Sequence, residues 1–87
     1  MSNLATKILT KDGVLLQQVV CMPDGTQYQH RYEYDDFGLV QVVTSELKND
    51  NWIPIVMVEI VMITNILYHV YSEFIEGKWI ELSKSKG

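Results

Sequence analysis

The chain has 87 residues and a formal net charge of −4, which places it in the size range of one small acidic domain. Its composition, 47% hydrophobic and 21% charged, is typical of a folded chain and excludes a mainly disordered one. Because the seven Lys and Arg residues are scattered instead of forming a basic stripe, direct binding to DNA or RNA is disfavoured.

Two features bear on the compartment. Cys21 is the single cysteine, so no disulfide can form within the chain, and the opening MSNLATKILT lacks the pattern of a secretory signal. We therefore expect a reducing, cytoplasmic setting. Residues 52–75 are long and apolar, but Glu59 and Glu73 would each cost about 2.5 to 3.5 kcal/mol at the centre of a bilayer. We interpret this stretch as protein core and expect no membrane contact.

Turn signals recur at short intervals along the chain, and the runs between them are rich in Val, Ile, Tyr and Thr. The turns are KDG, PDG, DDFG, KNDN and EGK. This cadence predicts a single mainly β domain over residues 1–82, an antiparallel meander of about six strands that curls into a small barrel or sandwich. Residues 83–87 are expected to form a flexible polar tail.

The first strongly predicted hairpin surrounds MPDGT, with Pro23 and Asp24 central in a type I turn and Gly25 in the left-handed region. Turn chemistry and hydrophobic alternation then agree on one register. That register pairs Met22 with Thr26, Val20 with Tyr28, Gln18 with His30, Leu16 with Tyr32 and Val14 with Tyr34.

The next hairpin turns at DDFG, with Gly38 as a second left-handed residue. The expected pairs are Asp35 with Leu39, Tyr34 with Val40, Tyr32 with Val42 and His30 with Thr44. The stretch YEYDDFGLV resembles a single unit of the YD repeats of Rhs-type surface proteins, and no functional residue is carried over from this short resemblance.

Residues 53–63 are apolar on both parities apart from Glu59, which is typical of a strand covered on two sides or lying at a subunit interface. Pro54 predicts that pairing starts after it. Residues 65–76 fit either a strand or an amphipathic helix, and the strand is preferred because KWIEL needs a partner. An α+β fold with one helix at 65–76 is the alternative.

His30 lies on the same strand face as three tyrosines, which raises two interpretations. The first is a core histidine that is hydrogen-bonded to Gln18. The second is a ligand pocket in a small barrel or minor enzyme, formed by Gln18, Tyr28, His30 and Tyr32. The first is preferred, and no spacing of His, Cys or Ser predicts a metal site, a cofactor or a catalytic nucleophile.

The predicted strands have more apolar surface than so small a core can cover. This surplus favours a non-catalytic protein-interaction module over an enzyme. The candidate protein-binding residues are Trp52, Met57, Val58, Glu59 and Met62. Such a module would bind another protein, as inhibitor or immunity proteins do, or would associate with itself as a homodimer or larger homo-oligomer.

Overall fold

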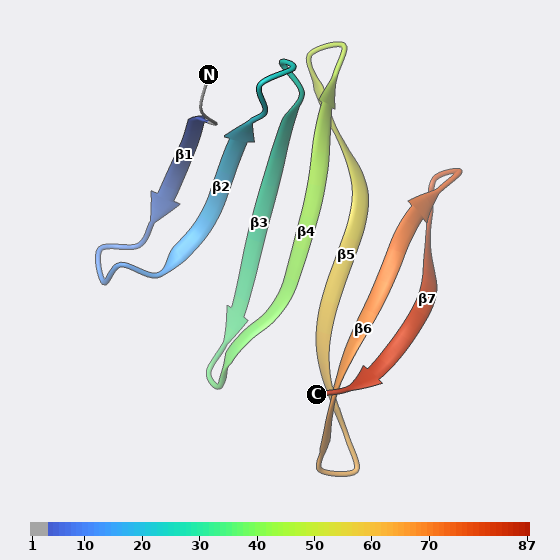
Figure 1. The fold of residues 1–87 in the computed structure, drawn as a ribbon. Helices are drawn as coiled ribbons and strands as arrows, with labels where there is room; N and C mark the ends of the chain where they lie inside the picture. The colour runs from blue at the N-terminus through green and yellow to red at the C-terminus, as the bar shows by residue number, and fades with distance from the viewer. Residues whose placement is uncertain (1–3) are drawn as a thin grey trace.

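The computed structural model describes residues 4–87, which form one antiparallel sheet of seven strands whose spatial order equals their order in the sequence (Figure 1). Every neighbouring pair is a hairpin, and five of the six turns lie at the predicted turn signals, whereas the turn at Thr64–Asn65 between β5 and β6 was not predicted. The strands are β1 (Leu4–Leu9), β2 (Leu15–Cys21), β3 (Gln27–Asp35), β4 (Gly38–Lys48), β5 (Asn51–Ile63), β6 (Ile66–Ile75) and β7 (Lys78–Lys86).

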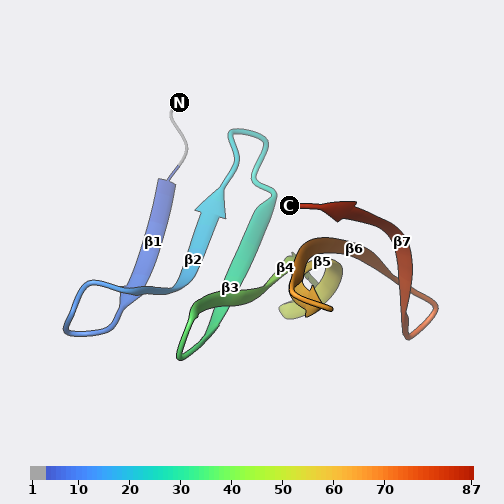
Figure 2. The ribbon, with the colours of Figure 1, turned by 90° about the horizontal axis from the view of Figure 1, so that it is seen from below.

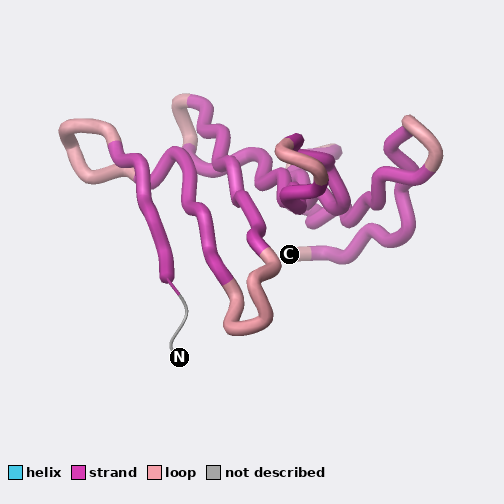
Figure 3. Tube along the Cα trace, turned by 90° about the horizontal axis from the view of Figure 1, so that it is seen from above, coloured by secondary structure: helices cyan, strands magenta, loops and turns pink. Residues whose placement is uncertain are grey.

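The sheet is open, so the predicted closure into a barrel or sandwich is wrong. β1 and β7 remain the two edges, and the sheet twists so strongly that β5–β7 run across the direction of β1–β3 (Figures 2 and 3). Lysines at positions 78, 84 and 86 of β7 are typical of an edge strand that resists further pairing. The radius of gyration is 14.6 Å, against about 12 Å for a compact chain of this length.

The register of the MPDGT hairpin is confirmed where β2 and β3 pair, with Gln18 opposite His30 and Val20 opposite Tyr28. The Met22 N–H donates to the Thr26 carbonyl at 2.8 Å, and Gly25 has a φ of +93°. Asp24 Oδ1 accepts the N–H of Thr26 at 2.9 Å, which holds the pKa of this carboxyl below its usual range. The turn is therefore fixed by local chemistry, which is why the sequence predicts it.

In the DDFG hairpin the pairs Tyr32–Val42 and His30–Thr44 are confirmed, but the two pairs nearest the turn are wrong. Asp35 lies opposite Gly38, and Tyr34 lies opposite Leu39. The register shifts between Glu33 and Tyr34, so Val40 becomes the extra residue of a β-bulge. A bulge adds one residue to one strand without any turn signal, so the alternation alone does not reveal it.

The start of β5 also differs from the prediction. Pairing with β4 begins at Asn51, ahead of Pro54, which lies opposite Ser45 beside a register shift. Pairing with β6 begins only at Val56, so the segment before it has one partner strand. Proline is tolerated there because its missing N–H costs no bond to a second neighbour.

The helix considered for residues 65–76 is wrong, because Ile66–Ile75 form β6. Tight turns at Thr64–Asn65 and Glu76–Gly77 enclose this strand, and all four turn residues have positive φ. Two-residue turns of this kind connect antiparallel strands, so the residues between them pair with β5 and β7 instead of forming a helix. The predicted flexible tail also differs, since residues 83–86 belong to β7 and the Gly87 N–H donates to the Leu67 carbonyl.

The two faces of the sheet differ in chemistry. We call the face that carries Tyr28, His30, Tyr32 and Tyr34 the tyrosine face, and the other the reverse face. Residues directly opposite one another share a face. Rows on the tyrosine face are Val20, Tyr28, Glu46 and Ile53; Gln18, His30, Thr44, Val56 and Glu73; and Tyr32, Val42, Val58 and Tyr71.

The small core lies on the reverse face. Among residues 7–87 only four are buried, namely Ser45, Met57, Val70 and Ser72, and the register puts all four on that side of β4, β5 and β6. Within residues 4–87 there is no helix long and apolar enough to cross a membrane.

Candidate interaction surface

The tyrosine face is uncovered, and its apolar side chains lie on both sides of a row that contains Gln18, His30, Thr44 and Glu73. Beyond the rows above, it carries Ile60 and Met62 from β5 and Leu67 from β6. Within residues 7–87 no residue on this face is buried. Apolar strand faces of this extent normally pack against a second layer, because burial out of water is the main favourable term in folding. The structure therefore presents one face of a core without the layer that would complete it.

The reverse face explains why the chain nevertheless forms a sheet. Met57 is 8% exposed, and its sulfur accepts a hydrogen bond from Gln41 Nε2 at 3.1 Å. Val70 is 5% exposed one strand further along. Toward β2 and β3 the same face becomes polar, with Gln17, Gln29 and Arg31 in line with the buried rows. The reverse face is thus part core and part solvated surface.

Two pairs of polar side chains on the tyrosine face are hydrogen-bonded within the chain. His30 Nδ1 lies 2.8 Å from Thr44 Oγ1, so the predicted hydrogen bond of His30 to Gln18 is replaced by one to the residue opposite it on β4. Tyr71 donates its hydroxyl proton to Glu73 Oε2 at 3.0 Å. These two pairs would meet a covering layer with their hydrogen bonds already formed.

The hydrogen bond between Tyr71 and Glu73 should make the stability of the fold depend on pH. This bond raises the pKa of the Tyr71 hydroxyl above its usual value, since the carboxylate accepts the proton that ionisation removes. A raised pKa in the folded chain means that the bond stabilises the fold below pH 10, and that this contribution is lost as pH rises through the folded pKa.

We expect one late tyrosine transition in an ultraviolet titration of the folded protein. Glu73→Gln should move that transition toward the ordinary tyrosine value, and Tyr71→Phe should delete it. A titration in which all tyrosines ionise together, and in which Glu73→Gln has no effect, would contradict the assignment.

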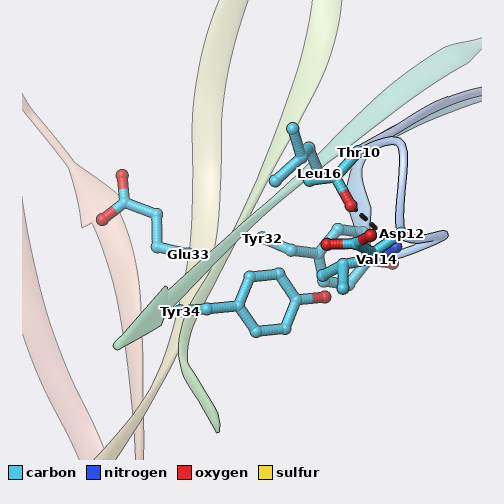
Figure 4. A pocket seen from close by; sticks show the side chains of 7 residues that line it. All are labelled: Thr10, Asp12, Val14, Leu16, Tyr32, Glu33 and Tyr34. Carbon is cyan, nitrogen blue, oxygen red and sulfur yellow. Dashed lines mark hydrogen bonds between the residues drawn. The ribbon is translucent and has the colours of Figure 1, made fainter. Parts of the chain in front are cut away.

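An open hollow lies on the tyrosine face where the turn between β1 and β2 meets β3, with a volume of about 460 Å³ (Figure 4). Apolar side chains from Val14, Leu16 and Tyr32 line it, and the Tyr34 hydroxyl donates to the Leu15 carbonyl at 2.7 Å. Glu33 points to the other side of β3 (Figure 4). Thr10 and Asp12 also line this hollow, which is open to solvent, unlike the enclosed cavity of a typical small-molecule site.

A second, smaller hollow of about 270 Å³ lies at the turn between β3 and β4. The side chains that line it are almost all apolar, and Phe37 stands at its rim with 98% of its surface exposed. The lining residues are Asp35, Phe37, Leu39, Val40, Ile60, Met62 and Leu67. This part of the tyrosine face combines a projecting aromatic ring with an apolar recess.

The candidate protein-binding residues do not form one surface. The alternation along β5 puts Val58 and Met62 on the tyrosine face, whereas Met57 and Glu59 lie on the reverse face. Met57 is core, while Met62 is 63% exposed and lines the second hollow. Trp52 lines a separate hollow of about 190 Å³ on the reverse face. Only Val58 and Met62 of this set thus belong to the uncovered face.

The four residues considered for a ligand pocket share the tyrosine face, and all are half-buried. Tyr32 lines the open hollow, but Gln18, Tyr28 and His30 line none of the three hollows. Across residues 4–87 no group of three His, Cys, Asp or Glu side chains is placed to hold a metal ion. The described geometry brings together an apolar surface instead of a set of reacting groups.

The candidate protein-binding residues named from the sequence omit Phe37 and Ile60, although Ile60 lies within the apolar stretch 53–63. A signal for Phe37 existed, since a phenylalanine between Asp36 and Gly38 is unusual in a solvated acidic turn. Ile60 carried no such signal, because both parities of its strand are apolar.

Comparison with known proteins supports the fold alone. A crystal structure of a DUF3836 family protein from Bacteroides vulgatus superposes with a TM-score of 0.78, covering 98% of this chain and 97% of that one. The two sequences are 10% identical. No family model and no curated protein matches the sequence. The single antiparallel meander is thus an architecture that also occurs in an experimentally determined structure.

Proposed function

We propose that the chain is a non-catalytic protein-interaction module whose tyrosine face is covered by a protein partner. The observation that carries the proposal is that the apolar rows of this face contain no buried residue, whereas the core lies wholly on the other side. Uncovered apolar patches of this kind mark interaction surfaces. Their burial would supply the second layer that the sheet lacks.

The distribution of charge supports the same role. Acidic residues occur at the hairpin turns, at Asp12, Asp24, Asp35, Asp36 and Asp50, whereas Glu46 and Glu73 lie within the rows of the tyrosine face. The acidic turns border the face, as a polar rim borders an interface. The half-buried free thiol of Cys21 suits a reducing compartment, and we place the module in the cytoplasm.

The proposal is tested by two matched lysine substitutions. Val58→Lys puts a charge at the centre of the tyrosine face, and Gln29→Lys adds the same charge on the solvated part of the reverse face. We expect both variants to keep the β-sheet circular dichroism spectrum. Val58→Lys should lose association, by light scattering with itself and by pull-down with other proteins, and Gln29→Lys should keep it. Equal behaviour of the two variants in every binding assay would overturn the proposal.

A further inference from the structure

We infer that the partner is a second copy of this chain, and that the Phe37 ring of each copy sits in the apolar hollow of the other. The inference rests on the proposed function and names its partner. Its two parts, the projecting ring and the recess, lie next to each other on the same end of the tyrosine face.

Phe37 is held out in solvent by its backbone. Its N–H donates to Asp35 Oδ1 at 2.8 Å, and Gly38 follows with a φ of +129°, so the tip of the hairpin is fixed without help from the ring. The ring is 98% exposed and contributes nothing to the fold of a single chain. Large apolar rings buried at the centre of an interface carry much of its binding energy, so an exposed ring at the tip of a hairpin is well suited to anchor one.

The neighbouring hollow offers the matching recess. Ile60, Met62 and Leu67 line it from β5 and β6, and Leu39 and Val40 line it from β4. Its one charged member, Asp35, already accepts the Phe37 N–H. The volume of about 270 Å³ is sufficient for an aromatic ring, and the walls expose apolar atoms that a ring would cover.

Symmetry favours a second copy over an unrelated protein. In a two-fold dimer the same patch occurs on both partners, so each patch must carry both the projecting group and the group that receives it. Phe37 and the recess satisfy this requirement because they are adjacent. Rotation of one copy about an axis between them would insert both rings at once.

The exposed area agrees with a dimer of ordinary size. A compact monomer of this mass exposes about 5,300 Å², whereas the chain exposes 6422 Å². The excess of about 1,100 Å² exceeds the roughly 800 Å² that a standard interface covers on each partner. A second copy with an interface of standard size would therefore remove most of this excess.

Charge gives a readout that separates a second copy from a basic partner. Two copies each carry a formal charge of −4, and Asp35 and Asp36 flank the ring, so their repulsion opposes association and is screened by salt. Association between copies should strengthen as salt rises. Binding to a basic foreign protein would weaken over the same range.

The test is analytical ultracentrifugation of the full chain from micromolar to submillimolar concentration, at low and high salt. We expect the mass of two chains, with tighter association at high salt. Phe37→Ala and Met62→Lys should each raise the dissociation constant about 10-fold or more. Asp36→Ala, a neighbouring substitution at the same tip, should not raise it.

A cross-linking experiment tests the geometry. In a Cys21→Ser background, chains with Phe37→Cys are mixed with chains with Met62→Cys under mild oxidation. The inferred contact predicts a disulfide-linked pair that joins the two kinds of chain. A monomer at all concentrations, or a dimer unaffected by Phe37→Ala, would overturn the inference. In that case the proposed function would still hold if Val58→Lys abolished binding to another protein. If Val58→Lys changed no binding, the proposed function would fail together with the inference of a second copy.

Discussion

We expect Met57→Lys to unfold the chain, whereas Val58→Lys, at the next position of the strand, should keep the fold. Met57 is 8% exposed on the reverse face and lies between Val43 and Ser72 in the sheet, whereas Val58 is half-exposed on the tyrosine face. An unpaired ammonium group at a buried position costs several kcal/mol. A domain of this length is stable by only about 4 to 13 kcal/mol, so this cost removes much or all of its stability.

Urea unfolding followed by circular dichroism measures the difference. Met57→Leu, which keeps the volume and the apolar character, is the control and should cost less than about 1.5 kcal/mol. Met57→Ala should cost about 2 kcal/mol or more, through the cavity that it leaves. If Met57→Lys were as stable as Val58→Lys, the assignment of the core to the reverse face would be wrong.

The contrast between these two neighbours marks the limit of what the sequence predicts. Alternation and turn chemistry suffice for β2 and β3, because MPDGT has one favourable conformation and the two parities differ in polarity. In β5 both parities are apolar, so the pattern does not say which is core. The choice depends on how the whole sheet twists, which is a property of all seven strands together.

Closure of the sheet was unpredictable for a related reason. Hairpin signals describe only neighbours in the sequence, and whether β1 meets β7 depends on the accumulated twist and on edge chemistry. The bulges at Val40 and beside Pro54 also change the twist without leaving a mark in the alternation. The candidate surface was therefore only half predictable, since Val58 and Met62 belong to it while Met57 and Glu59 do not.

The thermal stability of the wild-type chain is expected to rise with its concentration. If two copies cover each other's tyrosine faces, unfolding also separates them, and mass action then links the melting temperature to the amount of protein. With an unfolding entropy of about 2.1 cal/mol/K per residue for a dimer of this chain, each tenfold increase should raise the melting temperature by about 4 °C. A monomer would melt at one temperature throughout.

Differential scanning calorimetry from about 5 to 500 µM would show this as a total shift of about 8 °C. Val58→Lys should abolish the concentration dependence, because its charge lies in the apolar row formed by Tyr32, Val42 and Tyr71. The variant should also melt at or below the most dilute wild-type sample, since it lacks the stabilising layer at every concentration. A wild-type melting temperature that stays constant over this range would show that the tyrosine face is not covered by a second copy. If the melting temperature also stayed unchanged when a captured foreign protein was added, no partner would cover the apolar rows. The proposed function would then fail as well.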